Sequence, residues 1–147
     1  MSQQPVDRAA MEALIAEHIP FHKMLGLRIQ TMGEGKARAS LPFRPELIGD
    51  PLRPAIHGGV IATILDACGG FAVWGNLTME DRVSTIDLRV DYLAPAGADT
   101  LIAEAEVVRV GNRVAVVDIR VWQEQNPTKI VATGKGVYNI RRKDDRP

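Results

Sequence analysis

Residues Pro54 to Asn76 read PAIHGGVIATILDACGGFAVWGN, and this stretch decides the fold. Between residues 60 and 74 the only polar side chains are those of Thr63 and Asp66. A helix that is apolar on nearly all sides is a buried helix. The run is shorter and richer in glycine than a membrane span of about 20 apolar residues. The sequence therefore predicts a central helix that the rest of the chain encloses.

One carboxylate, Asp66, lies in the middle of this run. An ionised carboxylate in such surroundings is costly unless it is paired, neutralised or used in a reaction. The residues alone are compatible with two interpretations. Asp66 is either a structural acid that accepts hydrogen bonds from a nearby backbone group or hydroxyl, or a reactive group in a site.

The composition is that of an ordinary globular protein of 147 residues, large enough to bury its own core. Eighteen basic and 18 acidic residues give a formal charge of zero, which argues against a nucleic-acid-binding protein. The single cysteine, Cys68, excludes an intrachain disulfide, and its place in the apolar run predicts a buried filler. Trp74 and Trp122 are expected in the core or in an interface. The first ten residues show no signal peptide, so we expect a cytoplasmic protein.

Outside the central helix, the sequence pattern predicts an N-terminal helix and six strands. The helix occupies residues 1–20, with Asp7 as a cap and Pro20 at its end. Alternating apolar and polar residues indicate strands around residues 27–32, 36–43, 83–93, 101–110, 113–123 and 130–140. The charged tail, residues 141–147, is expected to fray.

Turn signals and alternation predict the details of these strands. Gly33-Glu34-Gly35 and Gly111-Asn112 are typical of hairpins, and Asn126-Pro127 is typical of a turn. Strict alternation along residues 83–93 predicts two faces for this strand. One carries Ile86, Leu88, Val90 and Tyr92, and the other carries Thr85, Asp87, Arg89 and Asp91.

This order of elements predicts an α+β fold in a single domain over residues 1–147. We expect a curved, mostly antiparallel sheet of about six strands, wrapped around the long central helix. A sheet wrapped in this way leaves an edge or a face to be covered, so we also expect a homo-oligomer.

The segment HGGVIATILDACGGFAV, which begins at His57, resembles the signature of hotdog-fold acyl-CoA thioesterases of the phenylacetate-pathway (PaaI-like) type. Members of that family have His-Gly-Gly at the start of the central helix and an acid nine residues after the histidine. The strand that follows ends in Tyr/Phe-x-x-Pro. This chain has His57-Gly58-Gly59, Asp66 and Tyr92-Leu93-Ala94-Pro95. The resemblance covers residues 21–140.

The resemblance implies a hotdog fold and hydrolysis of an acyl-CoA thioester to a free acid and CoA. It implies that Asp66 is the nucleophile or the general base that activates water. The backbone N–H of Gly58 would polarise the thioester carbonyl, and His57 would position that carbonyl or the loop. A hydroxyl that holds the water would come from Thr85 or from its neighbour Ser84. The family also implies a homodimer, or a homotetramer made of two dimers.

The chain departs from the family pattern in the loop before His57. Many relatives have Asn or Gln about six residues before the histidine, whereas this chain has Pro51 there, preceded by Asp50. Either Asp50 contacts the substrate in place of the amide, or the site functions without such a residue.

The residues support the same chemistry without the family. The N–H groups at a helix N-terminus suit the oxyanion of a tetrahedral intermediate, and Gly58 and Gly59 let an acyl group approach the backbone closely. A carboxylate needs no metal or other cofactor to attack or to hold a water. However, Gly58 and Asp66 lie about 12 Å apart along one helix. Two antiparallel helices across a two-fold axis would bring Asp66 of one subunit to Gly58 of the other.

Two other functions are compatible with the sequence. A hotdog-fold hydratase or dehydratase uses a histidine together with an acid on a differently patterned helix, so the acid nine residues after His57 favours hydrolysis. A non-catalytic hotdog protein would bind an acyl group or another ligand and would tolerate the loss of Asp66. The sequence does not distinguish among arylacetyl, benzoyl and medium-chain acyl groups.

Overall fold

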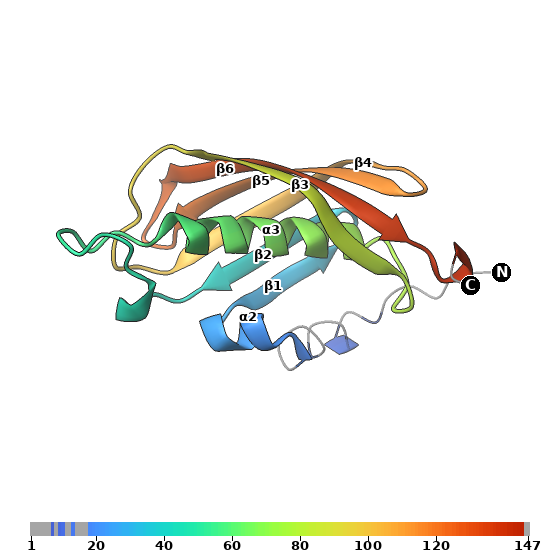
Figure 1. Ribbon diagram of the computed structural model, residues 1–147, viewed down its shortest axis with the longest axis horizontal. Coiled ribbons are helices and arrows are strands. Elements are labelled where there is room, and N and C mark those ends of the chain that lie inside the picture. Colours follow the sequence, from blue (N-terminus) through green and yellow to red (C-terminus); the bar gives the residue numbers. More distant parts are fainter. Residues whose placement is uncertain (1–6, 8, 11–12, 14–17, 146–147) are drawn as a thin grey trace.

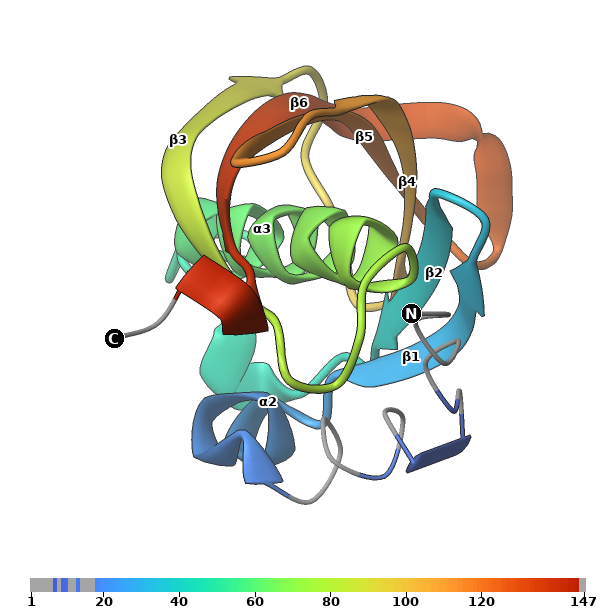
Figure 2. The same cartoon turned by 90° about the vertical axis from the view of Figure 1, so that its right-hand side faces the viewer.

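The computed structural model describes residues 7, 9–10, 13 and 18–145, which form one curved sheet with a helix inside it. Helix α3, Gly58–Trp74, runs through the middle of the molecule (Figure 1). Figure 2, which looks nearly along α3, shows the sheet as an arch around the helix. The predicted fold class, an antiparallel sheet wrapped around a long central helix, is confirmed. The predicted N-terminal helix falls largely outside the described residues.

The six strands all pair antiparallel, in the spatial order β1-β2-β4-β5-β6-β3. Their bounds are β1 Arg28–Gly33, β2 Lys36–Leu41, β3 Arg82–Tyr92, β4 Leu101–Val110, β5 Val114–Gln123 and β6 Asn126–Arg141. Strands β1 and β3 are therefore the two edges of the sheet.

The core lies between α3 and the concave face of the sheet. Ile64, Leu65 and Cys68 of α3 have no exposed surface. The sulfur of Cys68 lies 3.6 Å from the carbonyl oxygens of Ala37 and Ala103. Burial raises the pKa of the Cys68 thiol to about 12. The prediction that Cys68 is buried is confirmed.

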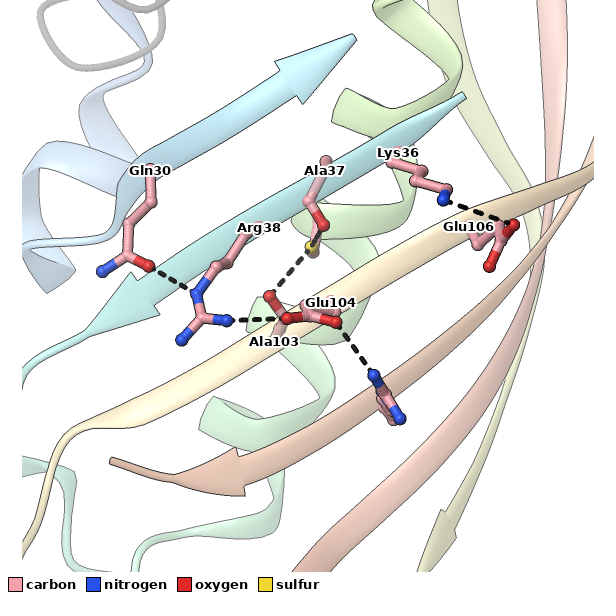
Figure 3. Close-up of polar contacts among 9 residues, drawn as sticks. Gln30, Lys36, Ala37, Arg38, Ala103, Glu104 and Glu106 are labelled. Carbon is pink, nitrogen blue, oxygen red and sulfur yellow. Dashed lines mark hydrogen bonds and ion pairs between the residues drawn. The ribbon is translucent and has the colours of Figure 1, made fainter. Parts of the chain in front are cut away.

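The outer face of the sheet carries charged side chains, because residues alternate along each strand. Arg38 donates hydrogen bonds to Gln30 and Glu104, and Arg120 donates to the second carboxylate oxygen of Glu104 (Figure 3). Both guanidinium groups lie over the ring of Trp122, at 5.3 and 5.4 Å from its centre. Trp122 is therefore buried beneath this network rather than in the core around α3.

The segment after Pro20 differs from its prediction. Residues Pro20–Leu25 form helix α2, whereas the sequence pattern predicts that a helix ends at Pro20. Proline suits the first turn of a helix because the N–H that it lacks would have no partner there. Gly26, in the left-handed region with φ of 74°, ends α2.

The turn predicted at Asn126-Pro127 is also displaced. Asn126 already pairs with Gln123, so Glu124 and Gln125 make the turn and β6 begins at Asn126. The pairing of β6 with β3 reaches only to Ala132. Pro127 is tolerated because it lies on an open edge, where its missing N–H breaks no ladder bond.

Strand β3 departs from strict alternation at one point. Its register opposite β6 changes between Thr85, which pairs with Tyr138, and Asp87, which pairs with Val137. Ile86 is the extra residue of a β-bulge. Thr85 therefore reaches Asp66 on α3, while Ile86 is 57% exposed. Thr85 and Ile86 lie on opposite faces, as predicted. Their faces relative to Leu88 and Val90, which pack against the core, are the reverse of the prediction because of the bulge.

The chain is described as far as Asp145. After β6, Lys143–Asp145 form the short 3-10 helix η2. The backbone N–H of Lys143 donates to the buried carboxylate of Asp81 at 3.0 Å, which attaches this segment to the loop before β3. Among the residues that the structure describes, no helix has both the length and the apolar character needed to span a membrane.

Candidate active site

Asp66 lies in the middle of α3, within reach of edge strand β3. Its side chain is half-buried, and Thr85 Oγ1 donates a hydrogen bond of 2.7 Å to Asp66 Oδ1. Within the described part of the chain, Asp66 makes no ion pair and its Oδ2 has no donor. The carboxylate is held at one oxygen and is available at the other.

A second residue of the sheet holds the backbone of Asp66. The hydroxyl of Tyr138, which lies opposite Thr85 in the strand pairing, donates a hydrogen bond of 2.8 Å to the carbonyl oxygen of Asp66. Tyr138 is 1% exposed. Burial, with a smaller contribution from the charge of Asp66, raises the pKa of Tyr138, so its hydroxyl remains a donor. Gly69 provides space for this ring, because a Cβ there would lie 2.9 Å from Tyr138 Cζ.

The start of α3 is built by the His-Gly-Gly motif. His57 is the N-cap, and its Nδ1 accepts a hydrogen bond of 2.8 Å from the backbone N–H of Gly59. An accepting Nδ1 carries no proton, so the ring proton is on Nε2. The N–H of Gly58 has no acceptor among the described residues. It is the kind of open donor that a helix N-terminus offers to an anion.

Tyr92, the aromatic residue of the Tyr-x-x-Pro motif, fixes the same helix start from strand β3. Its hydroxyl donates a hydrogen bond of 3.0 Å to the carbonyl oxygen of Gly58. A Cβ at position 58 would lie 3.2 Å from Tyr92 Cε1, so the ring packs directly against this glycine. The His-Gly-Gly motif and the Tyr-x-x-Pro motif are thus in contact in the fold.

The structure does not bring all the predicted site residues together within one chain. Gly58 and Asp66 are separated by two turns of α3, about 12 Å along its axis. Asp50 lines a hollow formed by residues of its own loop, without Asp66. Its carboxylate accepts hydrogen bonds from the Leu52 backbone and from Arg53, and these bonds hold the pKa of Asp50 below its usual value.

Two cavities meet at Asp66, and we name each after a residue of α3 toward which it extends. The Trp74 cavity has a volume of about 220 Å³ and includes Ser84 and Thr85 in its wall. The Thr63 cavity has a volume of about 270 Å³. Asp66 and His22 line both cavities. The carboxylate can therefore be reached from two sides.

His22 is a site residue that the sequence analysis missed. Its ring packs edge-on against Phe71, with 5.6 Å between ring centres. Its Nδ1 is buried without a hydrogen-bond partner. Burial lowers the pKa of His22, although the charge of Asp66 acts in the opposite direction, so the ring is neutral near pH 7. The described residues hold no cluster of three His, Cys, Asp or Glu side chains that could bind a metal ion.

The chain is similar to known proteins in sequence and in fold. The family model described as the thioesterase superfamily matches residues 54–130. A Salmonella typhimurium protein named medium/long-chain acyl-CoA thioesterase YigI is 33% identical over 136 residues, which are 84% of this chain and 86% of the relative.

Solved structures are similar as well. A Shewanella oneidensis protein related to the thioesterase superfamily has a TM-score of 0.75 and 32% identity, covering 89% of this chain and 93% of the other. The Escherichia coli PaaI protein from the phenylacetic acid degradation operon has a TM-score of 0.78 and 26% identity, covering 92% and 95% of the two chains.

Proposed function

This chain belongs to the thioesterase superfamily, and we propose on that basis that it hydrolyses an acyl-CoA thioester to a free acid and CoA. The placement of Asp66 carries the proposal: a half-buried carboxylate, held by Thr85 at one oxygen, lies where two cavities meet. A purely structural carboxylate in a buried setting is normally paired or fully hydrogen-bonded. We assign the catalytic roles of the PaaI-like type to Asp66, Gly58, His57 and Thr85.

In this proposal Asp66 is the general base. Its Oδ2 accepts a proton from a water molecule as the water oxygen bonds to the thioester carbonyl carbon. The carbonyl oxygen becomes an oxyanion, and collapse of this intermediate breaks the carbon–sulfur bond. The proton taken up by Asp66 then passes to the CoA thiolate, which leaves as a thiol. Thr85 orients the carboxylate throughout.

The oxyanion needs a donor that Asp66 cannot provide, and the open N–H of Gly58 is suited to it. Because Gly58 and Asp66 of one subunit are too far apart, we propose a homodimer with its α3 helices antiparallel. Asp66 then faces Gly58 of the partner subunit, which gives two equivalent sites. The unpaired edge of β3, with Ile86 exposed, borders the same region. A tetramer of two such dimers is the assembly that the family pattern favours.

The remaining predicted site residues have supporting roles in this proposal. His57 accepts the N–H of Gly59 and thereby leaves the N–H of Gly58 for the substrate carbonyl. Ser84 contributes to the wall of the Trp74 cavity. Asp50, whose two oxygens are occupied by its own loop, shapes that loop instead of contacting the carbonyl.

For the acyl group, we propose a medium-length or long chain. The support is the name of the Salmonella typhimurium relative, which is more similar in sequence to this chain than the PaaI protein is.

The test is the release of free thiol from acyl-CoA substrates, from acetyl-CoA to palmitoyl-CoA and including phenylacetyl-CoA. Thiol release that depends on the protein supports the proposal. Hydration of an enoyl-CoA without thiol release would instead identify a hydratase. Saturable binding of acyl-CoA without any turnover would identify a binding protein, and either result would refute the proposed hydrolysis.

A further inference from the structure

The Trp74 cavity follows one face of α3. Its wall on the helix consists of Asp66, Ala67, Gly70, Phe71 and Trp74. The last four of these residues follow Asp66 by one, four, five and eight positions, so all five lie in a single stripe along the helix. The opposite wall comes from β3, with Thr85 beside Asp66 and Val83 further along the strand. The cavity is therefore elongated, with the carboxylate at one end and the indole at the other.

Small residues keep this stripe open. Ala67 and Gly70 occupy the middle of the helix wall, between Asp66 and Trp74. A Cβ on Gly70 would meet only Tyr138 Cε1, at 3.7 Å, which is an ordinary contact distance. The space in front of Gly70 is thus a void that a larger side chain would fill.

Away from Asp66 and the hydroxyl groups of β3, the cavity is lined mainly by apolar side chains, with the ring of His22 against Phe71 as the polar member. Ile19, Phe71 and Val83 line it together with Trp74. The indole Nε1 of Trp74 is itself buried and has no hydrogen-bond partner in the described chain. Trp74 therefore offers no accessible polar group to a ligand, and this part of the cavity favours a hydrocarbon group.

The dimensions fit a chain of medium length. Asp66 and Trp74 are eight residues apart in α3, or about 12 Å along its axis. An extended chain gains roughly 1.2 Å per bond, as the span of a polypeptide shows, so about ten bonds fit between the two residues.

We propose that the Trp74 cavity binds the acyl chain of the substrate and that Trp74 and Gly70 determine the chain length accepted. The carbonyl carbon lies at Asp66, and the terminal methyl of a straight, saturated, medium-length chain contacts Trp74. This inference rests on the proposed function, because it assigns the acyl side of the same site. It also revises the expectation that Trp74 is merely a core or interface residue.

The CoA arm does not fit this cavity. The arm is long and ends in polar groups, so it cannot terminate against an apolar wall. The Thr63 cavity lies along the segment of α3 between Gly58 and Asp66. That segment faces the partner subunit in the proposed dimer, where the oxyanion donor approaches. The Trp74 cavity extends away from it and is the one left for the acyl chain.

The test is the chain-length profile of kcat/KM for saturated acyl-CoAs from butanoyl-CoA to palmitoyl-CoA. In the wild type, we expect kcat/KM to rise about fourfold per methylene until the chain reaches Trp74, because each methylene leaves water for an apolar wall. The Gly70→Leu variant fills the void, so its optimum should move to shorter chains. The Trp74→Ala variant removes the end wall, so its optimum should move to longer chains.

Two further variants complete the test: a smaller change at Gly70 and a control at Trp122. Gly70→Ala adds one methyl at an ordinary contact distance and favours the helix, so it should fold even if Gly70→Leu does not. It should reduce activity on the longest accepted chain and spare shorter ones. Trp122→Leu is the matched control, since Trp122 packs under Arg38 and Arg120 on the outer face. Its chain-length profile should equal that of the wild type.

The outcomes separate this inference from the proposed function. If the wild type hydrolyses acyl-CoAs and the folded Gly70 and Trp74 variants change activity equally at every chain length, the inference is overturned while the thioesterase proposal stands. A Trp122→Leu variant that shifts the optimum as Trp74→Ala does would also overturn it. If the wild type releases no thiol from any substrate, the proposed function fails, and this inference fails with it.

Discussion

Thr85 Oγ1 donates a 2.7 Å hydrogen bond to Asp66 Oδ1, and it does so from a β-bulge on the edge strand next to α3. Bulges commonly re-aim a side chain beside an active site. Without the extra residue Ile86, the alternation of β3 would put this hydroxyl on a different face from Leu88 and Val90, which pack against the core. The orientation of the carboxylate therefore depends on a local irregularity of the sheet.

The hydroxyl of Thr85 should be measurable in catalysis. Thr85→Val keeps the branched shape and removes the donor to a charged group, a bond worth about 1.5–3 kcal/mol. We expect kcat to fall roughly ten- to a hundredfold, with a smaller change in KM, when thiol release is followed under steady-state conditions. Thr85→Ser retains a donor and should recover most of the rate. Equal rates for Thr85→Val and wild type would show that Thr85 has no role in catalysis.

Tyr138 and Tyr92 form a matched pair for stability, because each donates to a backbone carbonyl oxygen of α3. Tyr138 is 1% exposed and Tyr92 is 55% exposed. We expect Tyr138→Phe to lower the free energy of unfolding by about 1–2 kcal/mol, since a buried acceptor loses a partner. Tyr92→Phe should cost less, because water replaces the lost bond. Urea unfolding of both variants measures the difference, and a larger loss for Tyr92→Phe would contradict the packing described.

His22 should make stability depend on pH. Its pKa in the folded protein is lowered, chiefly by burial, so the unfolded chain binds a proton more readily. The free energy of unfolding then falls as the pH drops through the unfolded pKa of about 6.5, until the folded ring also protonates. The urea midpoint, measured between about pH 5 and about pH 8, should change less with pH for His22→Gln than for wild type. His18→Gln, at an exposed position, is the control and should retain the wild-type slope.

The proposed sharing of each site between two subunits predicts complementation in mixed dimers. Gly58→Pro removes the proposed oxyanion N–H, and proline suits the first position of a helix. His57 already has φ of −57° and ψ of 134°, which a residue before proline adopts readily. Each variant dimer, Gly58→Pro or Asp66→Asn, should be inactive. Purified mixed dimers should have one working site of two and about half the wild-type kcat per dimer. Mixed dimers without activity would show that no site combines Asp66 and Gly58 of different subunits.

The sequence predicts the fold because its two periodicities are clear. Residues 60–74 are apolar on nearly all sides, which indicates an enclosed helix, and later segments alternate as strands do. The His-Gly-Gly motif likewise marks the start of α3, since its cap is local to the sequence. Local signals of this kind depend on neighbours in the chain and can be interpreted without a structure.

The details that the sequence does not show are long-range. Tyr138 is 72 residues from Asp66, and no local pattern indicates that its hydroxyl reaches α3. His22 lies just after Pro20, in a segment whose helix begins at the proline instead of ending there. The bulge at Ile86 depends on pairing with β6, so alternation alone places Thr85 on the wrong face relative to Leu88 and Val90. Each of these contacts is set by tertiary packing.

The most direct measurement is the rate of thiol release by Asp66→Asn beside wild type, on the acyl-CoA that the wild type hydrolyses fastest. Asparagine can still accept the Thr85 hydrogen bond, so the fold should be kept, and unchanged circular dichroism and oligomer size would verify this. A lost general base predicts a fall in kcat of about a hundredfold to ten-thousandfold. A folded Asp66→Asn protein with the wild-type rate would show that this carboxylate is structural and would contradict the account.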